Sequence, residues 1–502
     1  MNLAPARHRT SGGSPSRNRR APGALLAFAV AAWVLPLPAG QLPGDTVARV
    51  DVRRTLDSLV SNEDTDGDKK ITIDDPHIPG TDRGDKNFWL TGADNRRREV
   101  TGTYYLSNLL QELKLAEEEG VDSTSLSASR IFEPPVHRIS RSIRELYRKG
   151  LTREIDERGL LRIIADEKNP SVDGFRYLYV PGDDSTAVAY YSRIAVTHPE
   201  WKIKVARLPR TITPAYVRSL QGRHGLLTLA LRRTTQGTLE GIPFVVPGGR
   251  FNEMYGWDSY FIALGLLQDG RVELAKGMVE NLEYEIDHYG AILNANRTYY
   301  LTRSQPPFFT SMALAVFHRM PRDSSSLAWL ARALEAAIRE YRGVWVNADR
   351  LTWTGLSRYY DAGTGPPPEV EPGAFDSVYA PYARRFGLPL PDFERKYREG
   401  SIAVPELDAY FRNDRSMRES GHDTSYRLLG RSADLVTVDL NSLLYKFERD
   451  IGSTIGSVFG GRLAMSQGSV ERAAAWYRRA GHRRDAINRY LWNRRRGMFF
   501  EN

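Results

Sequence analysis

The chain contains no cysteine among its 502 residues. Without thiols it can form neither disulfide bonds nor thiolate metal sites, and this mildly favours a reducing compartment. The sequence also lacks a visible fixed-period repeat. Its 41% hydrophobic and 26% charged residues are typical of a soluble globular protein with a large core. We expect one large domain preceded by smaller N-terminal pieces.

The apolar run at residues 24–35 is too short for a comfortable membrane span. Basic residues precede it and Pro-Ala-Gly follows at residues 38–40, so it resembles a signal peptide. Residues 1–23 are rich in Arg, Ser, Pro and Gly, a composition that predicts disorder. Residues 1–45 are therefore expected to form a disordered or signal-like tail.

The formal net charge is +9, and much of the excess arginine lies near the two ends of the chain. Nucleic-acid binding is one interpretation of such runs. No nucleic-acid-binding motif accompanies the charge, so a disordered tail and a solvated helix face explain it better. We expect no nucleic-acid partner.

Helical periodicity dominates the chain. Residues 103–113 place Leu106, Leu109, Leu110 and Leu113 on one face of an amphipathic helix. Further helices are predicted around residues 143–147, 226–231, 261–267, 327–341, 440–451 and 470–492. Residues 171–207 are the exception, because apolar and aromatic residues alternate there in strand fashion before a Pro-Gly turn. The pattern predicts a predominantly helical domain with a few strands.

The stretch at residues 247–260 reads Pro-Gly-Gly-Arg-Phe-Asn-Glu-Met-Tyr-Gly-Trp-Asp-Ser-Tyr. Its glycines allow a tight backbone approach, Arg250 offers a planar fork of donors, and its aromatic residues offer flat faces. That mixture suits a ligand covered in hydroxyl groups. On residue types alone, a glycine turn leading into a buried aromatic helix is an equally good interpretation.

This stretch resembles the first signature of the trehalases of glycoside hydrolase family 37, with every fixed position present. Further stretches are similar to neutral trehalases, and the similarity runs from about residue 50 to the C-terminus. These stretches are residues 103–113, 294–308, 355–359 with 367–369, 418–423 and 438–445. The resemblance implies an (α/α)6 toroid and the inverting hydrolysis of α,α-trehalose to glucose.

The resemblance also implies roles for single residues. Asp423 matches the general acid, which must hold a proton near neutral pH and therefore needs a raised pKa. Glu419, close in sequence, is a candidate for the like charge that raises it. Taken alone, Asp423 also reads as the residue that caps a helix. The residues that match sugar-binding positions are Arg250, Trp257, Asp258, Asn294, Arg303, Glu369 and Gly421. For Arg250 and Arg303, the alternative to sugar binding is a structural role in ion pairs of the toroid.

Residues 64–75 have the oxygen spacing of an EF-hand-like calcium loop. Lys69 replaces the usual glycine and Asp75 the usual glutamate, and an acidic surface turn is the alternative. The neutral trehalases of fungi are similar here too, so we expect Ca²⁺. The expected ligands are Asp64, Asp66, Asp68, Asp75 and the Lys70 carbonyl. The expected domains are thus this calcium-binding region at residues 46–100 and a catalytic domain at residues 101–502.

One departure from the family concerns the general base. The family carries this glutamate after a second signature, Gln-Trp-Asp-x-Pro-x-Gly-Trp, which does not occur here. Glu501 does not match its motif, so no residue is assigned as general base. We expect an incomplete toroid whose helix at Leu440, Leu443, Leu444 and Phe447 lacks a packing partner. A truncated, inactive, sugar-binding relative of trehalases is the alternative function.

The expected location is the cytoplasm, with secretion through residues 24–35 as the alternative. The absence of cysteine and the resemblance to the cytosolic trehalase branch favour the cytoplasm. The only usable N-glycosylation sequon, at residues 296–298, lies between two predicted sugar-binding residues, where a glycan would obstruct the site. Besides trehalose, we expect a phospho-dependent regulatory partner at the N-terminal region and no stable membrane insertion.

Overall fold

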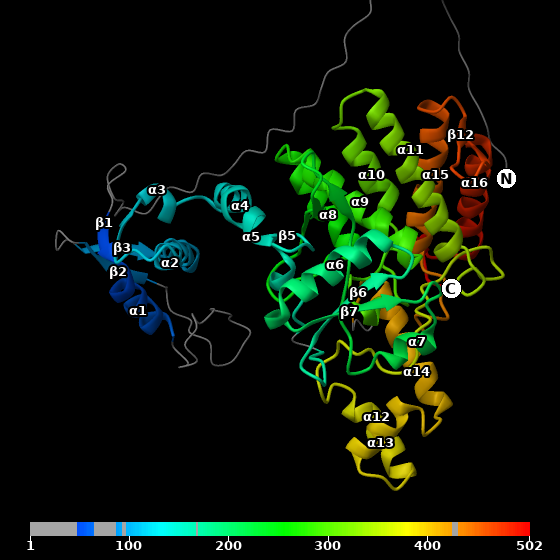
Figure 1. Ribbon diagram of the computed structural model, residues 1–502, viewed down its shortest axis with the longest axis horizontal. Helices are drawn as coiled ribbons and strands as arrows, with labels where there is room; N and C mark the ends of the chain where they lie inside the picture. Colours follow the sequence, from blue (N-terminus) through cyan, green and yellow to red (C-terminus); the bar gives the residue numbers. More distant parts are fainter. Residues whose placement is uncertain (1–47, 65–86, 93–96, 167–168, 424–429) are drawn as a thin grey trace, which may run out of the picture. The chain divides into compact units, whose positions relative to one another are not determined.

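A computed structural model describes residues 48–64, 87–92, 97–166, 169–423 and 430–502. They fall into two compact units, Met1–Ile139 and Ser140–Asn502 (Figure 1). Within the described ranges, every helix is too short or too polar to cross a bilayer. The predicted tail at residues 1–45 and four of the predicted calcium ligands lie outside the described residues. Those ligands are Asp66, Asp68, Lys70 and Asp75.

The first unit combines two antiparallel strand pairs with short helices. Strand β1 pairs with β4, and β2 pairs with β3. The elements are β1 (Ala48–Asp51), α1 (Val52–Glu63), β2 (Asn87–Thr91), β3 (Arg97–Thr101), α2 (Thr103–Glu118), β4 (Ser123–Leu126), α3 (Ala128–Ile131) and α4 (Pro135–Ser142), which extends into the second unit. Leu106, Leu109 and Leu113 of α2 are buried, which confirms the predicted apolar face. They pack with the strands in one core, and the unit that contains this core continues to Ile139.

The second unit is mainly helical. Its helices are α5 (Arg148–Leu151), α6 (Ser185–Thr197), α7 (Pro214–Ser219), α8 (Gly256–Gln268), α9 (Val272–Tyr289), α10 (Phe309–Phe317), α11 (Ser324–Glu340), α12 (Asp376–Arg385), α13 (Leu390–Glu399), α14 (Pro405–Glu419), α15 (Val438–Ser457) and α16 (Ala473–Tyr490). Short 3-10 or π turns are η1 (Ile143–Tyr147), η2 (Leu160–Arg162), η3 (Pro199–Trp201), η4 (Thr298–Tyr300) and η5 (Tyr341–Trp345). Most predicted helices are thereby confirmed.

The strands of the second unit are short. They are β5 (Thr152–Arg153), β6 (Arg176–Pro181), β7 (Ile203–Leu208), β8 (Leu226–Leu227), β9 (Leu231–Arg233), β10 (Leu239–Gly241), β11 (Phe244–Val245), β12 (Arg462–Ala464), β13 (Val470–Arg472), β14 (Trp492–Asn493) and β15 (Met498–Phe499). Strand β6 confirms the predicted strand and lies parallel to β7 and β8, although its last four residues are all buried and do not alternate. The predicted helix at residues 226–231 is wrong. Its apolar run is too short to distinguish helix from strand by periodicity, and pairing with β6 makes Leu226 and Leu227 a strand.

Helices α8 to α11 pack side by side, and α10 also contacts α15 (Figure 1). Helix α16 covers α15. The expectation that this helix lacks a packing partner is wrong, because Leu440, Leu444 and Phe447 are fully buried in the main core, whereas Leu443 is half-buried. Beneath α16, Arg483 Nε donates to Glu448 Oε1 of α15 over 2.7 Å, which joins the two helices by a buried charge pair.

A test of this packing is the change Leu444→Ala. The side chain lies in the main core, so its truncation should leave a cavity and lower the free energy of unfolding by about 2–5 kcal/mol. Leu327→Ala on the exposed face of α11 is the matched control and should change it by less than about 0.5 kcal/mol. Urea unfolding measures both. Equal effects of the two changes would contradict a packed α15.

Candidate functional site

The stretch at residues 247–260 turns sharply and then starts helix α8. Gly248 and Gly249 both have positive φ. Gly256 opens α8, and a Cβ at this position would lie 2.9 Å from the carbonyl oxygen of Leu293. The glycine thus allows the helix start to lie against the segment that carries Asn294. Gln305 of that segment accepts a hydrogen bond from the backbone N of Trp257 over 2.9 Å, which fixes the first turn of α8.

Trp257 and Gly421 meet although they are far apart in sequence. Gly421 has φ +74°, and a Cβ on it would lie 2.4 Å from Cζ2 of Trp257. Only glycine therefore allows the indole to pack on the backbone that follows α14. This contact brings two of the predicted sugar-binding residues together, and it places both near Asp423, two residues further on.

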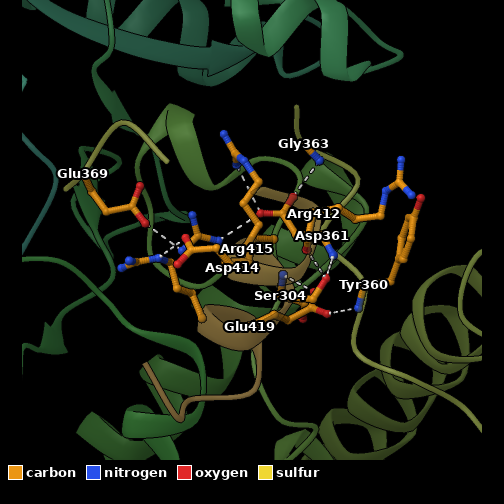
Figure 2. A network of polar contacts seen from close by, with 12 residues as sticks. Ser304, Tyr360, Asp361, Gly363, Glu369, Arg412, Asp414, Arg415 and Glu419 are labelled. Carbon is orange, nitrogen blue, oxygen red and sulfur yellow. Dashed lines mark hydrogen bonds and ion pairs between the residues drawn. The ribbon is translucent and has the colours of Figure 1, made fainter. Parts of the chain in front are cut away.

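Arg303 is the centre of a buried ion network, and Figure 2 labels its members Asp361, Glu369 and Arg415. Its Nε donates to Asp361 over 3.0 Å, and its Nη1 donates to Glu369 over 2.7 Å. Arg415 of α14 reaches the same Asp361 carboxylate over 3.2 Å. Burial acts to raise the pKa of Asp361, but Arg415 and Arg303 outweigh it and lower this pKa to about 2. The network therefore ties the segment of Arg303 to the 361–369 loop and to α14.

Two atoms in this network have no hydrogen-bond partner among the described residues. They are Nη2 of Arg303 and Oε2 of Glu369, and both are buried. Buried donors and acceptors are nearly always satisfied, so unpaired ones need an explanation such as a ligand or water. One is a donor and the other an acceptor, and a hydroxyl group offers the complementary acceptor and donor. The pair is thus suited to hold a polyhydroxylated ligand.

Asp423 lies just past the C-terminal end of α14, next to this network. The residue is exposed, yet partial desolvation by the surrounding protein raises its pKa. Arg303 and Arg418 act to lower that pKa, whereas Glu369 and Asp414 act to raise it. A carboxyl with these neighbours is suited to hold a proton.

Glu419 has a structural role and is not among the charges that raise the pKa of Asp423. Its carboxylate is fully buried and accepts hydrogen bonds from Arg350 Nη2 over 2.7 Å, from Ser304 N over 3.0 Å and from Tyr360 N over 2.7 Å. Figure 2 shows Glu419 between Ser304 and Tyr360. It therefore anchors the segment after Arg303 to the end of α14.

The remaining predicted sugar-binding residues differ in whether their polar side-chain groups are bonded to other described residues. Arg250 is exposed, and its guanidinium stacks over Phe251 without an ion pair to another described residue. Asn294 is buried, and its side-chain amide makes no hydrogen bond to another described residue. Asp258 lies in the first turn of α8, where burial raises its pKa. All three thus retain polar groups for a ligand, whereas Arg303 combines ion pairing with one unpartnered NH2 group, at Nη2.

Three residues of the site were not singled out from the sequence. Asp361 and Arg415 share an ion pair, and Arg418 donates to Asp414 over 2.9 Å while its charge reaches Asp423. Arg418 lies inside the stretch 418–423, so its position beside Gly421 was a usable signal. No periodicity or motif marks Asp361 or Arg415.

Glu501 does not lie free for catalysis. Its Oε2 accepts a hydrogen bond from Val438 N over 3.1 Å, at the start of α15. The adjacent residue Asn502 exchanges two backbone hydrogen bonds with Val436. A carboxylate at a helix N-terminus satisfies unpaired N–H groups there and stabilises the helix. Glu501 therefore stays without a catalytic assignment.

No metal site can be built from what the structure describes. In residues 48–64, 87–92, 97–166, 169–423 and 430–502, no group of three or more His, Asp or Glu side chains is arranged to hold a metal ion. Of the predicted calcium ligands, only Asp64 belongs to these ranges, at the C-terminal end of α1. Its backbone N donates to Val60 O over 2.8 Å, which closes the last turn of α1.

Comparison with known proteins gives one consistent family. The sequence model of the family described as Trehalase matches residues 121–501. A cytosolic neutral trehalase of Beauveria bassiana is 45% identical over 474 residues, covering 90% of this chain and 63% of that protein. A cytosolic neutral trehalase of Saccharomyces cerevisiae is 44% identical over 462 residues, covering 90% of this chain and 61% of that protein. The chain thus spans less than two thirds of the length of these relatives.

A solved structure agrees with the sequence matches. Neutral trehalase Nth1 from Saccharomyces cerevisiae superposes with a TM-score of 0.70 at 44% identity, covering 74% of this chain and 69% of that one. The paired helices of the second unit match this neighbour, which confirms the predicted helical toroid class with its few small strands.

The Gly421–Trp257 contact can be tested with Gly421→Ala. The new Cβ would clash with the indole at a backbone conformation that disfavours alanine, so the free energy of unfolding should fall by about 2–4 kcal/mol. Gly387→Ala is the matched control, because Gly387 also has positive φ but has no atom within 4 Å of its Cβ position. It should cost about 1 kcal/mol. Urea unfolding with tryptophan fluorescence measures both, and an equal cost would show that Trp257 does not pack there.

Proposed function

The chain belongs to the trehalase family, and from this premise we propose that it hydrolyses α,α-trehalose to two glucose molecules with inversion at one anomeric centre. The observation that carries the proposal is the buried Arg303–Glu369 pair with one unpartnered donor and one unpartnered acceptor. It lies beside Asp423, a carboxyl with a raised pKa. A hydroxyl-binding pair next to a proton donor is what hydrolysis of a sugar acetal requires.

Asp423 would donate its proton to the oxygen that joins the two sugars. Once this oxygen carries the proton, the bond to the anomeric carbon breaks and one glucose leaves. A water molecule then supplies hydroxide to the anomeric carbon from the opposite ring face, and its other proton passes to a base. In inverting enzymes this base is a second carboxylate about 6.5–9.5 Å from the acid. We assign no residue of the chain to it, because the family's signature for that glutamate does not occur in this sequence.

The sugar rings would be held from several sides. The half-buried indole of Trp257 offers a flat apolar face for a pyranose ring. The free groups of Arg250, Asn294 and Asp258 would hydrogen-bond its hydroxyls. The ion pairs of Arg303 with Asp361 and Glu369 fix the guanidinium before a ligand arrives, which lowers the ordering cost of binding.

Asp423→Asn tests the role of the general acid. An amide cannot donate the proton, so glucose release from trehalose should fall by about 10²–10⁴-fold while calorimetry still detects trehalose binding. In the unchanged chain, activity should fall as pH rises through the raised pKa of Asp423, since the acid is then deprotonated. Asp392→Asn, an exposed aspartate on α13, is the control and should leave both unchanged.

Two outcomes would contradict this assignment. Asp423→Asn with full activity would exclude Asp423 as the acid. Trehalose binding without any glucose release by the unchanged chain would instead favour the alternative of a non-catalytic sugar-binding protein.

We also propose Ca²⁺ binding by residues 64–75. Support comes from the spacing of Asp64, Asp66, Asp68 and Asp75, whose carboxylates repel one another until a cation arrives. Calorimetry should detect calcium binding that Asp66→Ala removes or strongly weakens, and Asp392→Ala should leave it unchanged. Absence of calcium heat at millimolar ion, or an unaltered heat in Asp66→Ala, would exclude the site.

We place the protein in the cytoplasm. Several relatives are named cytosolic neutral trehalases. In addition, Asn296 of the sequon is fully buried, and its side chain accepts from Met254 N over 2.9 Å and donates to Leu227 O over 3.2 Å. A glycan on that amide is incompatible with this packing. A phospho-dependent regulatory partner at the N-terminal region stays a prediction.

A further inference from the structure

A second pocket in the 140–502 unit has a different chemistry from the sugar site. It has a cavity volume of about 50 Å³ and lies between α7, α13 and the loop at residues 363–368. The polar side chains of its lining are those of Arg218, Gln221, His224, Tyr299, Thr364, Tyr397, Arg398 and Arg415. None of the predicted sugar-binding residues lines it, and its lining contains no Asp or Glu.

His224 places an imidazole ring beside this pocket. Only 6% of its surface is exposed, and burial lowers its pKa to about 4, so the ring is neutral. Thr298 Oγ1 accepts a hydrogen bond from Gly225 N over 3.1 Å and lies 3.1 Å from His224 Nδ1. Because the hydroxyl can either donate to Nδ1 or accept from Nδ1–H, these contacts allow both ring tautomers. Nε2 has no hydrogen-bond partner among the described residues, and in the tautomer that carries its proton there it can donate to a ligand.

The three arginines contribute unequally. Arg218 on α7 is exposed and forms no ion pair with a described residue. Arg398 on α13 donates through Nε to Glu394 over 2.9 Å, which leaves its Nη1 unengaged by any described residue. Arg415 is fully committed to the wall, because it donates to Asp361 and to carbonyl oxygens of the 364–366 segment. Arg218 is thus the cation available to a ligand, and Arg398, whose Nη2 also pairs with Glu394 over 2.8 Å, adds its Nη1 as a donor.

We propose that this pocket binds a phosphate group, either inorganic phosphate or that of a small phosphorylated molecule. Its lining combines Arg218 of α7, Arg398 of α13 and the His224 ring, so several N–H groups from separate segments are available for the acceptor oxygens of a tetrahedral anion. A neutral sugar fits less well, because its hydroxyls also need acceptors and the lining offers no carboxylate. The apolar lining residues Pro214, Val217 and Pro368 suit the remainder of a phosphorylated molecule.

Calorimetric titration of the whole chain with inorganic phosphate at low ionic strength tests the site. Binding should be saturable in the unchanged chain and weakened about tenfold or more by Arg218→Gln, which removes a charged donor. Arg395→Gln is the matched control, because Arg395 lies on the same helix as Arg398 but does not line this pocket. It should bind phosphate as the unchanged chain does.

A hexose 6-phosphate in the same titration separates the two sources of phosphate. Tighter binding than inorganic phosphate, lost in Arg218→Gln, supports a phosphorylated molecule; equal binding supports inorganic phosphate. The change His224→Phe should weaken the binding of either ligand. The melting temperature of this variant, compared with that of the unchanged chain, verifies that it is folded. No saturable heat at millimolar phosphate, or equal weakening by Arg218→Gln and Arg395→Gln, would overturn the proposal. Because no readout uses trehalose, the result is independent of the proposed hydrolysis.

Discussion

The buried guanidinium of Arg303 is the interaction on which the site depends. A buried charge is costly unless it is paired, and Arg303 has Asp361 on one side and Glu369 on the other. Through Asp361 the pairing extends to Arg415, so three segments distant in sequence converge on one positive group. Because the carboxylates hold two sides of the guanidinium, its unpartnered NH2 group is presented in one direction. The ion pairs that offset the cost of burying the Arg303 charge thus also orient its guanidinium, which we propose binds the sugar.

The carboxylates around Arg303 take different roles because their surroundings differ. Asp361 has two arginines, and its pKa is low. Glu419 receives Arg350 and two backbone N–H groups, so it serves as an anchor. Asp423 has partial desolvation and the nearby charges of Glu369 and Asp414, and its pKa is raised. When neighbouring carboxyl groups have different surroundings, their pKa values differ. One of them can then hold a proton as the acid while another stays ionised as a stabilising anion.

The 361–369 loop carries residues of both the proposed sugar site and the proposed phosphate pocket. On one side it carries Asp361 and Glu369, which hold Arg303. On the other side its Gly363–Pro366 segment lines the second pocket, where its carbonyl oxygens hold Arg415. Arg415 is therefore shared by both. A ligand in the second pocket would contact the same loop that positions the sugar-binding pair, which gives a direct physical path between the two sites.

The sequence by itself determined the mainly helical class, the apolar face of α2 and strand β6, and it located the contiguous stretches whose residues we propose for the sugar site. Those features depend on local periodicity and on residue types at fixed spacing. Only the tertiary structure decided that Leu226 and Leu227 form a strand, because pairing with β6 overrides a short apolar run. It also decided the roles of Asp361, Glu419 and Arg415, since an ion pair between distant segments leaves no periodic trace. The need for glycine at position 421 arises in the same way, from an indole more than 160 residues earlier in the chain that occupies the space of a side chain.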